Sequence, residues 1–133
     1  MGQSDPPASL ITVEAETRSL AKIRERVAAI ATSFGADPDT IGDITLAASE
    51  LSTNVLIHTS SPTISVGVEC ADDVVVLEVS DADGLYSTIR EAATTADSVT
   101  GRGLNVVRAV MDTVEFVERS GSRRVRCTKR TRR

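Results

Sequence analysis

Apolar residues recur at steps of three and four along two stretches in the first half of the chain, which is typical of amphipathic helices. A first helix is predicted from Thr17 to Phe34, and Gly35 follows at a position that commonly ends a helix. Its apolar face comprises Leu20, Ile23, Val27, Ile30 and Phe34. A second helix is predicted to begin at Pro38, with Asp37 as its cap. Its apolar face comprises Ile41, Ile44, Ala48, Leu51 and Val55.

Strict alternation of apolar and polar residues predicts strands elsewhere. Residues 10–16 form one candidate strand, and residues 63–70 and 74–81 form a hairpin that turns at the sequence ADD. By the period of two, Asp81 shares a side with Val75, Leu77 and Val79. If that side faces the core, the Asp81 carboxylate lies at the rim of the core. Burial of an unpaired carboxylate is costly, so Asp81 needs a partner or a ligand.

The second half of the chain begins with a polar stretch. Residues 82–100 are rich in Ala, Thr, Ser and Asp, and a loop of this length inside a compact domain is more often functional than idle. A third helix is predicted over residues 101–114, followed by a hairpin over residues 115–129 that turns at Ser120-Gly121-Ser122. The third helix buries Leu104, Val107, Val110 and Met111.

The predicted order is strand, helix, helix, hairpin, loop, helix and hairpin. Such blocks favour an α+β fold, a two-layer α/β sandwich with helices on one face of a mixed, mostly antiparallel sheet. The 133 residues correspond to one domain. We expect it to span residues 10–129, preceded by a disordered N-terminus (1–9) and followed by a basic tail (130–133).

Composition narrows the function classes. Aromatic residues make up only 2% of the chain, which argues against modules that stack nucleic-acid bases. Cys70 and Cys127 form no CxxC pair, and with a single His they make no standard zinc site. We expect reduced, packed thiols in a cytoplasmic protein, although a disulfide between them stays open. No apolar run approaches the length of about 20 residues that a membrane helix needs.

Charge is unevenly placed along the chain. The net charge is −4, yet residues 123–133 hold seven basic groups and no acidic one. The first 122 residues therefore hold eight basic and nineteen acidic groups, a net charge of −11. A basic run can contact nucleic acid, but an acidic body repels a phosphate backbone. The pattern favours a solubilising tail, partly a strand.

Three groups of residues are candidates for chemistry. Glu50 and Asn54 lie one turn apart on the second helix, about 40° from each other around its axis. An amide oxygen can ligate Mg²⁺, and a carboxylate can accept a proton from a hydroxyl. Spacing alone nevertheless favours two solvent-facing residues beside the core stripe. Gly101 and Gly103 at a helix start can admit phosphate oxygens, and Arg102 adds charge, but this pattern alone is weak.

Together these pieces resemble a known family. The segment SELSTNVLIH (49–58) resembles the N-box of the Bergerat-fold (GHKL) ATPases. The segments VSDADG (79–84) and GRGLNVV (101–107) resemble their first and second glycine boxes, in the same order and with similar spacing. Over residues 10–129 the chain is most similar to bacterial anti-sigma-factor serine/threonine kinases.

The resemblance implies a role for each matching residue. Asn54 would ligate Mg²⁺ between the phosphates of ATP, and Glu50 would be the general base. Asp81 would accept a hydrogen bond from the adenine amino group. His58 would be a supporting group rather than a phosphoacceptor, and residues 85–100 would form a lid. The remaining nucleotide-binding positions would be Gly84, Gly101, Arg102, Gly103 and Leu104.

The first glycine box departs from the family pattern Asp-x-Gly-x-Gly. Asp83 and Leu85 replace both glycines, and Gly84 stands between them. Glycine permits a close backbone approach that other residues resist, so altered adenine packing and a low affinity for ATP are expected.

The resemblance also implies partners. The chain would bind a sigma factor and phosphorylate a serine of an anti-anti-sigma factor, regulating transcription by partner switching. It would form a homodimer through its first strand and first helix. The alternative is a catalytically weak or inactive module of the same fold that sequesters a protein. A nucleic-acid-binding protein that uses the basic run is the least favoured.

Overall fold

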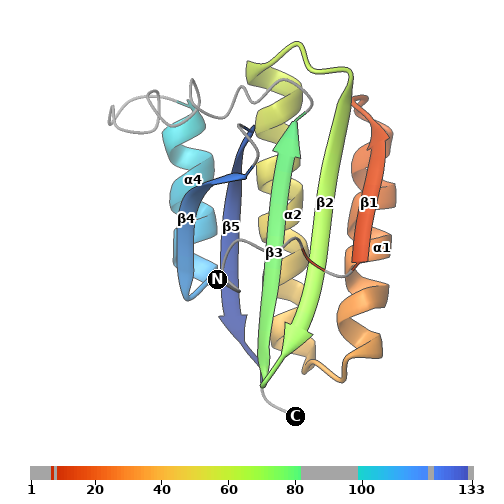
Figure 1. The fold of residues 1–133 in the computed structure, drawn as a ribbon, viewed down its shortest axis with the longest axis vertical. Coiled ribbons are helices and arrows are strands. Elements are labelled where there is room, and N and C mark those ends of the chain that lie inside the picture. Colours follow the sequence, from red (N-terminus) through yellow and green to blue (C-terminus); the bar gives the residue numbers. More distant parts are fainter. Residues whose placement is uncertain (1–6, 8, 82–98, 120–121, 132–133) are drawn as a thin grey trace.

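The computed structural model describes residue 7 and residues 9–81, 99–119 and 122–131, with the side chains of residues 99–103 and 122 left aside. Figure 1 shows the arrangement of the elements. In chain order these are β1 (Ser9–Glu14), α1 (Ser19–Ser33), α2 (Pro38–His58), β2 (Thr63–Ala71), β3 (Val74–Asp81), α4 (Val99–Val110), β4 (Thr113–Arg119) and β5 (Ser122–Arg130).

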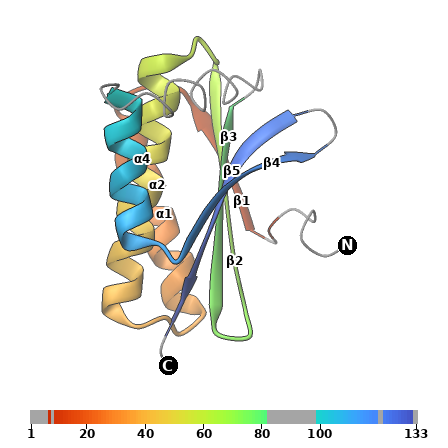
Figure 2. The same ribbon diagram turned by 90° about the vertical axis from the view of Figure 1, so that its left-hand side faces the viewer.

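The described strands form a five-stranded sheet in the order β1-β2-β3-β5-β4. All four pairings between them are antiparallel, where a mixed, mostly antiparallel sheet was expected. The three described helices cover one face of this sheet and leave the other face without a helix (Figures 1 and 2). The predicted two-layer α+β sandwich is therefore confirmed.

The core lies between the two layers, and the period-two pattern decides which strand residues enter it. In β3, Val75, Leu77 and Val79 have no exposed surface, and each faces a core residue across a neighbouring strand. The helices contribute aliphatic side chains to the core, mostly from their predicted apolar faces. The helical members with no exposed surface are Ile23, Val27, Ala31, Ile44, Ala47, Ala48, Leu51, Leu104 and Val107.

Local signals set the junction between the first two helices. Gly35 has φ +83°, a left-handed conformation that glycine adopts without strain. Its N–H donates to Thr32 O, and Ala36 N–H donates to Ala31 O, which together make a Schellman cap. The Asp37 side chain then accepts from Thr40 N–H and caps α2. The predicted end of the first helix and start of the second are confirmed.

The β2–β3 hairpin turns on two residues. Asp72 and Asp73 have φ 54° and 65°, so both are left-handed, as a type I′ turn requires. Aspartate tolerates this conformation better than most residues other than glycine and asparagine. The turn fixes the register that pairs Val66 with Val79 on the core side.

Two sequence-based expectations are corrected in the second half of the chain. The third helix was predicted to run to residue 114, but α4 ends at Val110 and Val114 lies in β4. The chain has already joined the sheet at Asp112, whose N–H donates to Thr128 O. The basic tail was predicted to begin at residue 130, but β5 continues to Arg130 and Thr131 beyond it is buried.

The predicted lid and the predicted disordered N-terminus are mostly made of residues that the structure does not describe. Residues 82–98, which hold most of the predicted lid, are among them, as are residues 1–6 and 8 of the N-terminus. Pro7 is buried, and Ser9 already begins β1.

The two cysteines are not joined by a disulfide. Cys70 lies in β2 and Cys127 in β5, and β3 runs between these two strands. Burial raises the pKa of the Cys127 thiol to about 12, so this group stays protonated in the core. Among the described helices, none combines the length and the apolar character needed to cross a membrane.

Candidate functional site

The C-terminal half of α2 carries the residues predicted to act on a ligand. Glu50 is half-buried and Asn54 is only 4% exposed, so both lie on the shoulder of the helix beside the buried residue Leu51. This agrees with positions that flank the apolar stripe. It excludes the simple interpretation of Asn54 as a solvent-facing amide.

Asn54 and His58 each hold a polar atom without a described partner. Asn54 Nδ2 and His58 Nε2 are buried and have no hydrogen-bond partner among the described residues. The two side chains lie one turn apart on one line of α2, about 40° from each other. A buried donor that lacks a partner costs about 1–3 kcal/mol, so such groups call for a ligand or water. Ser52 Oγ is also unpartnered, but it lies about 160° around the helix from Asn54.

The orphaned amide suits either a metal or a phosphate. A turn of 180° about the last side-chain bond of Asn54 exchanges its oxygen and its nitrogen. The oxygen can ligate a hard cation, and the nitrogen can donate to a phosphate oxygen. The donor set therefore fits a magnesium nucleotide. Among the described residues no group of three or more His, Cys, Asp or Glu side chains could hold a metal.

Asp81 occupies the last position of β3. It is 6% exposed and lies on the side of the strand that carries Val75, Leu77 and Val79, facing the helices as the alternation predicted. Its backbone partner across the sheet is Ile64 of β2. Asp81 thus places a carboxylate at the edge of the core, where β3 ends.

The glycines of the second candidate box lie inside α4. The helix begins at Val99, so Gly101, Arg102 and Gly103 belong to its first turns rather than preceding it. The first N–H groups of a helix lack intrahelical partners. In α4 these belong to residues 99–101, and the N–H groups of Gly103 and Leu104 fall within the helical ladder. The Leu104 side chain has no exposed surface, so only its backbone could meet a ligand.

The three pieces lie at one end of the molecule. Figures 1 and 2 show the end of β3, the C-terminal half of α2 and the first turn of α4 at the same edge of the sandwich. The middle helix α2 contacts both β3 and α4. Gly84 lies outside the described residues. The structure therefore brings together the elements that carry Asn54, Asp81 and Gly101, whose individual roles stay predictions.

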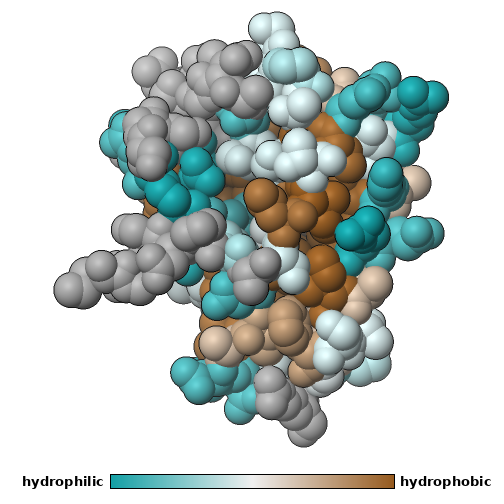
Figure 3. All heavy atoms as spheres, turned by 45° about the vertical axis from the view of Figure 1, so that its right-hand side comes forward, coloured by the Kyte–Doolittle hydropathy of each residue, from teal (hydrophilic) through white to brown (hydrophobic). Residues whose placement is uncertain are grey.

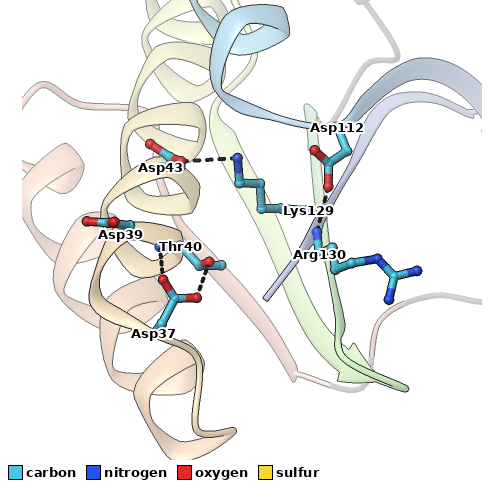
Figure 4. Close-up of a pocket in the computed structure, with 7 residues that line it drawn as sticks. All are labelled: Asp37, Asp39, Thr40, Asp43, Asp112, Lys129 and Arg130. Atoms are coloured by element: carbon cyan, nitrogen blue, oxygen red, sulfur yellow. Dashed lines mark hydrogen bonds and ion pairs between the residues drawn. The ribbon is translucent and has the colours of Figure 1, made fainter. Parts of the chain in front are cut away.

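A cavity of about 570 Å³ lies at the opposite end of α2, away from these residues (Figure 4). Its polar groups are used on one another: Lys129 Nζ lies 3.2 Å from Asp43 Oδ2, and Arg130 N–H donates to Asp112 Oδ2 over 2.7 Å. We interpret it as a joint between α2 and β5. The cavity is lined by Asp37, Asp39, Thr40, Asp43, Asp112, Lys129 and Arg130.

A second hollow of about 470 Å³ runs along β1 and the start of α1. It carries Glu16 and Arg18, which form an exposed ion pair with Nε 2.6 Å from Oε2. Exposed pairs of this kind contribute little to stability. Neither hollow is lined by Glu50, Asn54 or Asp81.

One charged cluster of the structure was not predicted from the sequence. Glu78 is 3% exposed, and its carboxylate contacts three arginines of β4 and β5 on the face without helices. The alternation of β3 contained the signal, since Glu78 falls on the side opposite Leu77 and Val79. Only the pairing of β3 with β5 shows which basic side chains meet it.

Comparison with known proteins identifies the fold and the family. The crystal structure of the RsbU and RsbW domains of Rv1364c from Mycobacterium tuberculosis matches with a TM-score of 0.66 and 19% sequence identity. The match covers 96% of this chain and 34% of that one, so this chain spans about a third of its length. A search of curated proteins finds no significant match. The family model of the histidine kinase-like ATPase domain matches residues 13–129. This match spans nearly the whole sandwich, and the chain therefore belongs to the histidine kinase-like ATPase family.

Proposed function

We propose that this protein is an ATP-dependent serine/threonine protein kinase that also acts as an anti-sigma factor. The observation that carries the proposal is the buried amide of Asn54, which lacks a described partner one turn from Glu50. Family membership supports ATP as the nucleotide. The RsbW domain in the matching structure, together with the resemblance of the motifs, supports the narrower assignment to anti-sigma-factor kinases.

The geometry suggests a division of labour around the nucleotide. Asp81 at the end of β3 would accept the adenine amino hydrogen, and the first turn of α4 would receive the phosphates with Arg102 beside them. Asn54 would hold Mg²⁺, which neutralises charge on the transferring phosphoryl group when bound. His58, one turn beyond Asn54, would present its buried Nε2, which has no partner among the described residues, within the same site.

Glu50 would act on the acceptor. Its half-buried position at the rim lets a partner's serine approach while the carboxylate keeps access to solvent. Glu50 takes the proton of the hydroxyl as the serine oxygen forms its bond to the γ-phosphorus, and the bond to the ADP oxygen breaks. The products are a phosphoserine on the partner and ADP.

The partners follow from the same assignment. The phosphate acceptor is a serine of an anti-anti-sigma factor. The sigma factor is the protein that this chain binds or releases as it switches between its two partners. We place the protein in the cytoplasm as a homodimer, joined through β1 and α1. Transcription would respond to the phosphorylation state of the acceptor.

The test separates binding from transfer. Calorimetric titration of Mg·ATP into the wild-type chain should show saturable binding, which chelation of Mg²⁺ weakens. Incubation with labelled ATP and a candidate anti-anti-sigma protein should label its serine. Glu50→Ala should keep the binding and lose the labelling. Equal labelling by wild type and Glu50→Ala would overturn the role of Glu50.

A second candidate is a binding module that has lost useful catalysis. Asp83 and Leu85 in place of the two glycines favour it, as does the start of α4 at Val99, which leaves Gly103 N–H inside the helix. In that case titration with millimolar ATP shows no heat, while a sigma factor still binds.

A further inference from the structure

The face of the sheet that no helix covers carries a dense charged cluster. Arg119 of β4 donates from both terminal nitrogens to Glu78, over 2.9 Å to Oε1 and 2.7 Å to Oε2. Arg126, directly opposite Glu78 on β5, donates to Oε2 as well. Arg124 lies two residues further along the same face, with its nearer terminal nitrogen 3.8 Å from Oε1.

The cluster holds more positive charge than its one buried acid, Glu78, can balance. Both oxygens of Glu78 accept from Arg119 and Arg126, and among the described residues the closest charged contact of Arg124 is the one of 3.8 Å to Oε1. Arg124 Nε is buried and has no hydrogen-bond partner among the described residues, although the side chain as a whole is 19% exposed. Three guanidinium groups against buried Glu78 and exposed Glu115, which lies opposite Arg126, leave a local charge of about +1 on an acidic protein.

The ionisation of the cluster reflects this imbalance. Burial lowers the pKa of Arg124, and the neighbouring Arg119 charge lowers it further. Burial alone would raise the pKa of Glu78, but the hydrogen bonds from Arg119 and Arg126 outweigh it and hold that pKa below its usual value. The acid is thus held ionised, while the third arginine is crowded by like charge. One arginine would have satisfied Glu78, so stability alone does not explain Arg124.

We propose that this part of the helix-free face, defined by Arg119, Arg124 and Arg126, is a docking site for an acidic segment of a protein partner. A carboxylate of the partner would pair with Arg124, supply the acceptor that its Nε lacks and offset the excess positive charge. Charge complementarity therefore selects the occupant. This site is separate from the nucleotide end of α2 and does not depend on the kinase assignment.

Neighbouring residues favour a protein over a nucleic acid. Exposed Glu115 lies directly opposite Arg126 on β4 and would repel a continuous chain of phosphates. Elsewhere on this face Leu10 is 65% exposed and Val76 is half-buried. Figure 3, which views the molecule obliquely from the side of β1, shows hydrophobic residues in the middle of the surface. An apolar region beside a charged one is typical of protein interfaces.

The experiment uses the full chain and a probe of stated chemistry. The probe is a blocked synthetic peptide of alternating Glu and Leu, with a Gln–Leu peptide of equal length, inorganic phosphate and single-stranded DNA as comparison ligands. Wild type should bind the Glu–Leu peptide, and amide shifts in an NMR titration should map to β4 and β5. Arg124→Gln should weaken binding by about tenfold or more.

A matched control is available on the same strand. Arg130 is exposed on the same face of β5, so Arg130→Gln removes the same charge without touching the cluster. It should change the affinity by less than about twofold, since exposed charges beyond a Debye length are screened. Equal losses in Arg124→Gln and Arg130→Gln would overturn the site, as would equal binding of the Gln–Leu peptide or tighter binding of DNA.

Stability provides an independent readout. If Arg124 serves a partner, Arg124→Gln removes a crowded charge and should unfold at the same temperature as wild type or higher. A lower unfolding temperature together with unchanged peptide affinity would show a purely structural role and overturn the proposal. A wild-type dimer that Arg124→Gln dissociates, with no binding of the peptide to either protein, would identify a second copy as the occupant and also overturn it.

Discussion

The two ends of α2 treat their polar side chains in opposite ways. At the N-terminal end, Asp37 accepts from Thr40 N–H and from the Thr131 hydroxyl, and Thr131 in turn accepts from Asp37 N–H. At the C-terminal end, Asn54 and His58 bury donors that have no described partner. Within the described residues, one helix therefore begins in a joint whose polar groups are paired and ends with two buried nitrogens that lack a partner.

This difference between the two ends of α2 distinguishes a structural role at its start from a proposed ligand-binding role at its end. Saturated polar groups stabilise the contact between α2 and the end of β5, where Lys129 also donates to Val110 O over 2.7 Å. Buried polar atoms without a partner among the described residues cost stability, and their position on α2 agrees with the nucleotide site that we propose at this end.

The largest expected effect is on catalysis at the unsaturated end. Glu50→Gln keeps the shape of the side chain but removes the base, so the rate of transfer to a partner serine should fall by about 100- to 10,000-fold. The affinity for Mg·ATP should stay near the wild-type value. Single-turnover phosphorylation and calorimetry measure the two quantities. A variant that transfers at the wild-type rate would remove Glu50 from the mechanism.

The next largest effect concerns binding. Asn54→Ala should weaken Mg·ATP binding by about 10- to 100-fold, because a charge-assisted contact is lost. The nucleotide-free protein should unfold at a temperature no lower than wild type, since a buried unpartnered amide has been removed. Calorimetry and thermal unfolding check the two halves. Clear destabilisation without loss of nucleotide affinity would make Asn54 a structural residue.

A smaller effect is expected at the saturated end. Asp37→Ala removes the cap of α2 and its link to Thr131, and the free energy of unfolding should fall by about 1–2 kcal/mol. Affinity for Mg·ATP should not change, because the lost contacts lie at the far end of the helix. Urea unfolding gives the first quantity. Asp37→Asn serves as the control, since it keeps an acceptor and should lose less stability.

The smallest effect is expected from the ion pair in the same joint. Lys129→Met keeps the apolar stem but loses the contact to Asp43 and the hydrogen bond to Val110 O. The side chains of Lys129 and Asp43 are both partly exposed, so the free energy of unfolding should fall by at most about 1 kcal/mol. A loss larger than that of Asp37→Ala would contradict this ranking of the joint's contacts.

Much of this architecture could be predicted from local patterns. The stripe of α2, its Asp37-Pro38 start and the left-handed Gly35 each depend on a few neighbouring residues, and each prediction was confirmed. The position of Asp81 on the core side of β3 followed from alternation alone. Glu50 and Asn54 were singled out by resemblance, because their spacing alone favoured ordinary surface residues.

Other features depend on contacts between distant segments. The helix predicted to residue 114 ends at Val110 because Thr113 pairs with Thr128, a register that no local pattern encodes. The basic run was predicted to be partly a strand, but its place between β3 and β4 depends on strand pairing, as does the burial of Thr131, which was expected to lie in a tail. The arginine cluster needs three strands that meet only after folding.

The sequence by itself determined the type and order of the helices and strands, the start of α2, which faces are apolar and which residues are candidates for nucleotide chemistry. Caps, turns and periodicity act over a few neighbouring residues, which is why these features could be predicted. The tertiary structure alone decided that the end of β3, the end of α2 and the start of α4 meet at one edge. The tertiary structure also decided that three arginines surround Glu78 on the face of the sheet that no described helix covers. Both depend on strand order and register, which arise from pairing between segments far apart in the chain.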